Sequence, residues 1–331
     1  MSACTICLEY DPAPIQLGCA CRSDAGLAHV SCMVEKATWQ HAHRGNDAWY
    51  TCQTCEHFFT GAMRIGLADA WCSIAPERLR VDAAANRGSA LAASGDTAAE
   101  PILRQVLVET RRVYGHEHPE TLTAANNLGW ALMAAHKCAS AERILRETLA
   151  VQRRVLGDEH PSNLKSASNL ASALIRLGKP ADAERILRHV LSCMKRVLGE
   201  EHPNTLMTAG CLTTALLEQE RPEKLAQAER VCEEVRAVQM RVLGPDHPDT
   251  LTTTYNLASA LSTCLNVSSL NVSMFRKIER AEGLFRSLLD AQRRVYGDTH
   301  PRTSDIIESL LAIARFRKSA PGLINDRNME E

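Results

Sequence analysis

Apolar residues are distributed unevenly along the chain and divide it into two parts. Beyond residue 77, leucine and alanine recur between charged residues in phrases such as Asn169-Leu-Ala-Ser-Ala-Leu174 and Ala183-Glu-Arg-Ile-Leu187. Such spacing is typical of helices that bury one face. The composition shifts toward Ala, Leu, Arg and Glu only after Cys55, and the segment before it contains few large apolar side chains. We therefore expect a helical region preceded by a segment that is stabilised in another way.

The helical region contains a phrase that recurs five times. Its copies begin at glycines that are 42, 42, 45 and 53 residues apart: Gly115-His-Glu-His-Pro-Glu-Thr-Leu122, Gly157-Asp-Glu-His-Pro-Ser-Asn-Leu164, Gly199-Glu-Glu-His-Pro-Asn-Thr-Leu206, Gly244-Pro-Asp-His-Pro-Asp-Thr-Leu251 and Gly297-Asp-Thr-His-Pro-Arg-Thr-Ser304. A period of this size predicts a solenoid built from one repeated pair of helices. The spacings differ only between the two helices of a pair, so we expect the inserted residues at that turn.

Each residue type in the phrase suits the junction between two helices. Glycine tolerates the positive φ found just past a helix end, and proline fits the first turn of the next helix. Five histidines precede the prolines and resemble a metal or catalytic array: His118, His160, His202, His247 and His300. Since each stands directly before a helix-start proline, we interpret them as structural residues of the turn.

The N-terminal segment carries seven of the thirteen cysteines. Together with one histidine they form four close pairs: Cys4 and Cys7, Cys19 and Cys21, His29 and Cys32, and Cys52 and Cys55. A closed structural zinc site takes four ligands, so eight ligands predict two zinc ions. Because the segment is near the lower size limit for a core of its own, metal binding is expected to supply much of its folding free energy.

The order of the ligands is shared by two kinds of double-zinc finger. PHD fingers, which read histone tails, have other gaps between the middle ligands and a Trp where this chain has Tyr50. The gaps here are 2, 11, 1, 7, 2, 19 and 2 residues, and this series resembles the RING-CH (RING-variant) finger. The resemblance covers residues 1–57 and implies interleaved ligands, with zinc 1 held by Cys4, Cys7, His29 and Cys32 and zinc 2 by Cys19, Cys21, Cys52 and Cys55.

RING-CH fingers are ubiquitin-ligase modules, so the resemblance implies an E3 ubiquitin ligase with no nucleophile of its own. In that family an apolar residue between the first two ligands and an aromatic residue on the helix after the sixth contact the ubiquitin-conjugating enzyme. By position these are Ile6 and Trp39, and for each the alternative is a place in the core. Glu56 and His57 stand where many RING ligases carry a cation. The alternative function is a non-catalytic scaffold or adaptor in which the finger is a structural or dimerising zinc module.

The repeats resemble the 42-residue tetratricopeptide repeats of kinesin light chains through phrases such as Asn-Leu-Ala-x-x-Leu, Ala-Glu-x-x-Leu and Arg-Val-Leu-Gly. In that family the first helix of each pair lines a concave face that binds peptides. The resemblance therefore implies a protein or peptide partner there. One position of this helix carries a recurring asparagine, the candidate peptide-binding residue: Asn86, Asn127, Asn169 and Asn256. The alternative is that these side chains cap or bridge neighbouring helices.

These features predict an all-α solenoid of TPR-like helix pairs with a small N-terminal RING-type finger. We expect the finger at 1–59, a connecting helix at 60–76, the solenoid at 77–317 and a disordered tail at 318–331. The solenoid comprises a degenerate first pair, four full repeats and a capping helix. A formal net charge of −1 over 331 residues gives no reason to expect nucleic acid. No apolar run approaches the roughly 20 residues of a membrane span. Without a visible signal peptide we expect a cytoplasmic protein, with the nucleus as the alternative.

Overall fold

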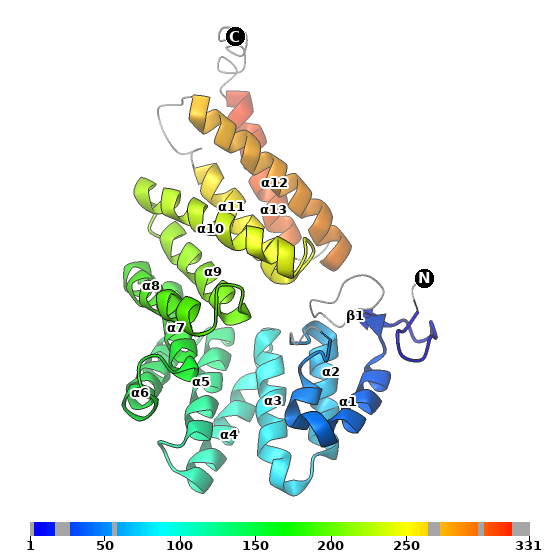
Figure 1. Cartoon of the computed structure of the whole chain (residues 1–331). Coiled ribbons are helices and arrows are strands. Elements are labelled where there is room, and N and C mark those ends of the chain that lie inside the picture. Colours follow the sequence, from blue (N-terminus) through cyan, green and yellow to red (C-terminus); the bar gives the residue numbers. More distant parts are fainter. Residues whose placement is uncertain (1–2, 17–26, 55–57, 264–271, 297–300, 320–331) are drawn as a thin grey trace. The chain divides into compact units, whose positions relative to one another are not determined.

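The computed structural model describes residues 3–16, 27–54, 58–263, 272–296 and 301–319 (Figure 1). The chain divides into an N-terminal unit, Met1–Gly199, and a C-terminal unit, Glu200–Glu331. In chain order the N-terminal unit contains β1 (Ile15–Gln16), β2 (Leu27–Ala28), α1 (Val30–Arg44), η2 (Gly45–Trp49), α2 (Gly61–Ile74), η3 (Glu77–Leu79), α3 (Arg80–Ala93), α4 (Ala99–Tyr114), α5 (Pro119–Ala134), α6 (Cys138–Leu156), α7 (Pro161–Arg176) and α8 (Pro180–Val197). The C-terminal unit contains α9 (Pro203–Leu217), α10 (Pro222–Val242), α11 (Pro248–Ser262), α12 (Val272–Tyr296) and α13 (Pro301–Ser319).

The repeat region forms the expected all-α solenoid of helix pairs. In the N-terminal unit α3 packs on α4, α5 on α6 and α7 on α8, and in the C-terminal unit α9 packs on α10 and α11 on α12. Helix α13 packs on α12 and extends two residues beyond the expected end of the solenoid. Among the helices that the structure describes, none is both long and apolar enough to cross a membrane.

Small residues allow the two helices of a pair to approach closely. A Cβ atom built on Gly129 of α5 would lie 2.7 Å from Leu145 of α6. At the equivalent place in the first pair, a Cβ on Gly88 of α3 would lie 2.5 Å from Leu103 of α4. Since Leu103 and Leu145 are fully buried, the glycines make room for the leucines that fill the core.

The junctions between repeats have the predicted construction. Gly115 has φ 88° and ψ 173°, and Gly157 has φ 87° and ψ 164°. In each of the four described turns, the Nδ1 atom of the histidine accepts a hydrogen bond of 3.1–3.2 Å from the backbone N–H two residues on; these are His118, His160, His202 and His247. The histidines are therefore helix N-caps, and the structural interpretation is confirmed for these four. His300 lies outside the described residues.

The inserted residues lengthen the second helix of a pair at its start. Helix α8 has 18 residues, whereas α10 has 21 and α12 has 25. The alanine that begins the buried stripe, Ala183, Ala228 or Ala281, stands progressively further from the start of its helix. The insertions therefore fall between the recurring parts of the two helices, as predicted, but the described ones extend the second helix instead of lengthening the turn.

The N-terminal segment does not fold apart from the helices that follow. Its buried residues form one apolar cluster that continues through α2 to Ala83 of α3. Trp49 of η2 stacks on Trp71 of α2 with ring centroids 4.9 Å apart. Helix α2 matches the predicted connecting helix, but it belongs to the core of this segment. Folding of the segment thus depends on shared apolar burial as well as on the metal binding that the sequence predicts.

Candidate metal centre and binding surfaces

The first predicted set of ligands comes together at the start of α1. His29 occupies the N-cap position of this helix, and Cys32 follows within its first turn. The turn that carries Cys4 and Cys7 is fixed by hydrogen bonds from the N–H of Cys4 to Glu9 O at 2.9 Å and from the N–H of Leu8 to Cys4 O at 3.0 Å. The backbone N–H of Thr5 then bonds to Leu27 O, next to the strand end before His29. Residues far apart in the sequence therefore meet at one point.

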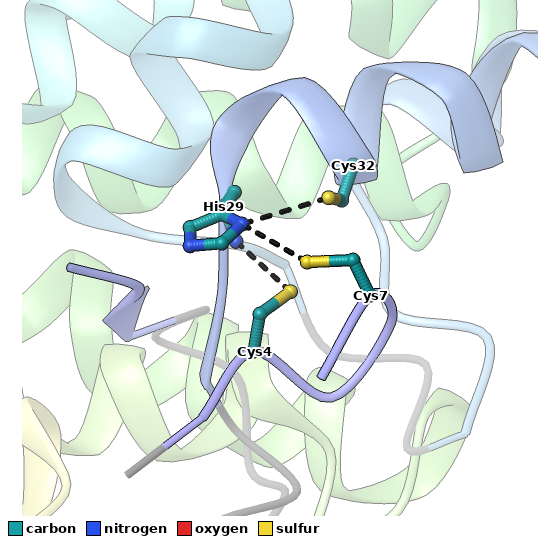
Figure 2. Close-up of side chains that lie close together, drawn as sticks. All are labelled: Cys4, Cys7, His29 and Cys32. Atoms are coloured by element: carbon teal, nitrogen blue, oxygen red, sulfur yellow. Dashed lines mark hydrogen bonds between the residues drawn. The ribbon is translucent and has the colours of Figure 1, made fainter. Parts of the chain in front are cut away.

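The four side chains converge in a group that could hold one metal ion (Figure 2). Their ligand atoms lie within 4.8 Å of one another. The ring Nδ1 atom of His29 is 3.3 Å from Cys7 Sγ and 3.7 Å from Cys32 Sγ. The backbone N–H of His29 donates to Cys4 Sγ at 3.5 Å. Ligands about 2.1–2.3 Å from a zinc ion at tetrahedral angles stand about 3.5–3.8 Å apart. These residues therefore fit a zinc ion.

The ionisation of the cysteines also fits a cation. Burial raises the pKa of the Cys32 thiol, and the neighbouring sulfurs of Cys7 and Cys4 raise it further. Burial opposes ionisation of Cys4 as well, but the N–H groups of Cys7, His29 and Ile6 outweigh it and lower the pKa of Cys4. Ionisation of Cys4 is thus favoured, whereas ionisation of Cys32 is opposed. A divalent ion removes this conflict because it binds all the sulfurs as thiolates.

The second predicted set of ligands is only partly described. Cys52 is buried in the turn after η2, and Arg44 of α1 donates to the carbonyl and hydroxyl oxygens of the adjacent Thr51. Cys19, Cys21 and Cys55 lie outside the described residues, so the second zinc site stays a prediction. His41, in the last turn of α1, packs its ring 4.8 Å from that of Trp71. Its Nδ1 bonds to Gly45 O.

The predicted contacts for a conjugating enzyme lie on the surface of the N-terminal unit. Ile6 is 39% exposed and Trp39 is 72% exposed, so neither fills the core. Two further apolar residues after the first ligand pair, Leu8 and Tyr10, are also exposed. Sequence reasoning missed these two because they stand outside the motif, although their place in a ligand loop was a usable signal. For Ile6 and Trp39, contact with a conjugating enzyme stays a prediction.

The recurring asparagines differ in their surroundings. Asn169 is buried, and its Nδ2 atom donates a 2.9 Å hydrogen bond to Asn126 Oδ1 on α5 of the preceding repeat. Here the structure has the bridging arrangement that was the alternative to peptide binding. Asn127 and Asn256 are half-buried, and the buried Nδ2 atom of Asn86 has no hydrogen-bond partner among the described residues. For these three, peptide binding stays a prediction.

Two basic side chains near these asparagines were not found from the sequence. Lys165 stands one turn before Asn169 on α7, and Arg64 belongs to α2. Burial lowers the pKa of Arg64, and burial together with the charge of Arg64 lowers that of Lys165. Within the described part of the chain no carboxylate pairs with either cation. The pair was missed because neighbouring repeats carry uncharged residues at the place of Lys165 and because α2 lies outside the repeat pattern.

Comparison with known proteins identifies the repeats. The profile of a tetratricopeptide repeat matches residues 82–120, 121–162, 164–204 and 205–249, just over half of the chain. No curated protein matches the sequence. The match supports a repeat that mediates protein binding, whereas no matching profile covers the N-terminal segment.

Solved structures agree with this result. A Podosopora anserina protein described as a putative kinesin light chain with nearly identical TPR-like repeats matches in two crystal structures. One of them, a variant with a single substitution, is 26% identical over 66% of this chain and 95% of its own, with a TM-score of 0.51. The other structure is 25% identical over 66% and 97%, with a TM-score of 0.50. BtubC (BKLC) from P. vanneervenii has the same fold at 15% identity and a TM-score of 0.52, over 83% of this chain and 94% of its own. The repeats are thus similar to those of kinesin light chain, and the chain belongs to the tetratricopeptide repeat family.

Proposed function

We propose that this chain is a RING-type E3 ubiquitin ligase. Its N-terminal finger recruits a ubiquitin-charged conjugating enzyme, and its repeats bind the substrate protein. The observation that carries the proposal is the assembled group of Cys4, Cys7, His29 and Cys32 with the exposed Ile6 between its first two ligands. Two zinc ions are the expected cofactors, and they serve to hold the ligand loops in place.

The residues of the finger bind and orient the conjugating enzyme. The N–H of Ile6 donates to Cys4 Sγ at 3.5 Å, so the metal group fixes the backbone that presents this side chain. Trp39 lies on the same helix as Cys32, two turns further on. Ubiquitin passes from the thioester of the conjugating enzyme to a lysine amine of the substrate, while this chain contributes positioning alone.

The repeats provide the protein-binding part of the molecule. In the N-terminal unit Lys165 stands one turn before Asn169 on α7, and Arg64 of α2 is close enough to influence its charge; among the described residues no carboxylate pairs with either cation. Lys165 is exposed and Arg64 is half-buried, so both cations can be reached by a ligand, and two neighbouring positive charges favour an anionic one. We therefore expect substrates to present acidic segments to this face.

An autoubiquitination assay with a panel of conjugating enzymes tests the ligase function. The wild-type chain is expected to form ubiquitin chains with at least one enzyme, and Ile6→Ala is expected to abolish them while retaining zinc. Val155→Ala on α6, where the valine is also exposed, is the matched control and should remain active. Absence of ubiquitin chains from a zinc-loaded protein with every enzyme would refute the proposal. Loss of zinc in Ile6→Ala would instead show that Ile6 stabilises the zinc-binding turn and is not a specific contact for the conjugating enzyme.

A non-catalytic zinc-finger and TPR scaffold is the second candidate. The stacking of Trp49 on Trp71 and the continuous core into α3 favour it, because they suit a finger that caps the start of the solenoid. Under this alternative, zinc-loaded protein forms no ubiquitin chains, and Ile6→Ala still binds the same partner proteins.

A further inference from the structure

A cavity of about 160 Å³ lies between the end of α6, the start of α7 and the middle of α8. Leu164 and Val190, both buried, form its floor, and Arg153, Arg185, His189 and the carboxylate of Asp158 stand at its rim. A cavity of about 150 Å³ in another protein accommodates benzene. The space here is therefore large enough for one side chain of a partner protein.

The rim retains many unused hydrogen-bond donors. Arg153 contacts Asp158 at 3.3 Å and Arg185 contacts Asp182 at 3.5 Å, both long for charge-assisted hydrogen bonds. The two arginine side chains are 53% and 80% exposed. Since a guanidinium carries five N–H donors, each arginine has most of its donors free for a ligand.

Comparison of the repeats indicates that the rim is specialised. In α6 of the preceding repeat, Arg143 stands at the place of Arg185 and pairs with Glu147, four residues on, at 3.8 Å. The following repeat also has glutamate there, Glu234. In α8 this place is taken by the exposed His189, whose Nε2 lies 3.9 Å from Cys193 Sγ. The carboxylate that contacts Arg185 is instead Asp182, one turn earlier, so the side facing His189 carries no acidic group of this helix.

We propose that this cavity binds an acidic side chain of a partner protein. Its carboxylate or phosphoryl group lies between Arg153, Arg185 and His189, and its apolar stem packs on Leu164 and Val190. The site is formed by other residues than Arg64 and Lys165, so it is a second binding place on the N-terminal unit. It does not depend on ligase activity.

Binding of labelled peptides to the full chain, followed by fluorescence anisotropy, tests the site. Three peptides share one sequence and carry glutamate, phosphoserine or glutamine at the central position. We expect the glutamate or phosphoserine peptide to bind and the glutamine peptide to bind at least about ten-fold more weakly, as for the loss of one charged hydrogen bond. Which acidic peptide binds more tightly identifies the anionic group.

Variants of the rim provide the second arm of the experiment. His189→Glu restores the carboxylate of the neighbouring repeats, so it should fold normally and weaken binding at least about ten-fold. Arg185→Ala should also weaken it, whereas Arg143→Ala is the matched control and should not. Circular dichroism confirms that the variants fold.

Three outcomes would overturn the proposal. Neither acidic peptide binds the wild-type chain, or His189→Glu binds as tightly as wild type, or Arg143→Ala weakens binding as much as Arg185→Ala. A loss of affinity in Lys165→Thr with none in His189→Glu would likewise assign the peptide to the other cation pair and exclude this cavity.

Discussion

Gly157 joins two repeats with a backbone conformation that other residues avoid. Its φ of 87° and ψ of 164° lie in a region that is essentially restricted to glycine. No atom would contact an added Cβ within 4 Å, so the obstacle is the conformation alone. Gly157→Ala is therefore expected to reduce the free energy of unfolding by about 1–3 kcal/mol, measured by urea denaturation.

Gly210 is the matched control for this substitution. It lies inside α9 with no neighbour within 4 Å of a built Cβ atom, and its φ is not positive. Gly210→Ala should leave stability unchanged or raise it by up to about 1 kcal/mol, because alanine is the better helix former. Equal effects of the two substitutions would contradict the conformational argument.

His160 stabilises the start of α7 through its ring nitrogen. Nδ1 accepts a 3.2 Å hydrogen bond from the N–H of Ser162, as in the equivalent turns. Loss of an N-cap costs about 1 kcal/mol, so His160→Ala should lower the free energy of unfolding by that amount. His160→Asn supplies another good cap and should lose less. If alanine and asparagine have the same effect in thermal denaturation, the capping role is wrong.

At the scale of the elements, ion pairs join the helices of adjacent repeats. Glu100 of α4 is nearly buried and bonds to Lys137, which precedes α6, at 2.8 Å and to Arg104 of its own helix at 2.8 Å. The pair recurs as Lys179 with Glu142 and, in the C-terminal unit, as Lys277 with Glu229. These contacts connect each second helix to the repeat that follows.

Glu100 should make the stability of the N-terminal unit depend on acid. The hydrogen bonds from Lys137 and Arg104 lower the pKa of this carboxyl. Its contribution is therefore fully present above pH about 4.3, the ordinary value for glutamate, and is lost as the pH falls through the lowered folded-state pKa. Glu100→Gln should lower the urea midpoint at neutral pH and lose less stability than wild type between about pH 5 and about pH 3. If the free energies of unfolding of wild type and Glu100→Gln change with pH in parallel, Glu100 does not cause the acid dependence.

The elements that follow from local signals were predictable from the sequence. Gly157, His160 and Pro161 mark a helix junction by their own conformational preferences, and the cysteine pairs require only a tight turn. Contacts between distant segments were not predictable. The bridge from Asn169 to Asn126 and the approach of Lys165 to Arg64 arise from the stacking of helices, which no spacing within a single repeat encodes.

At the scale of the whole molecule, tryptophan fluorescence arises from the N-terminal unit alone. Trp39, Trp49, Trp71 and Trp130 all lie in the N-terminal unit, and the first three belong to the finger and α2. The predicted zinc ligands all precede α2, whereas the helical signal arises mainly from α3 to α13. Fluorescence and circular dichroism therefore distinguish the finger from the repeats.

Metal removal should disrupt the finger and leave most of the helices folded. Without a cation the crowded thiols around His29 cannot all ionise, so the ligand turns lose their common anchor while the stacked repeats keep their own cores. A chelator is expected to change the tryptophan emission with little loss of far-UV signal, and added zinc should reverse the change. Cys32→Ser should reduce the bound zinc measured by mass spectrometry, whereas Cys138→Ser on α6 should not. The contrary outcome is that the chelator removes the zinc but leaves the tryptophan emission unchanged. The packing of Trp49 on Trp71 would then be sufficient to keep the finger folded without metal.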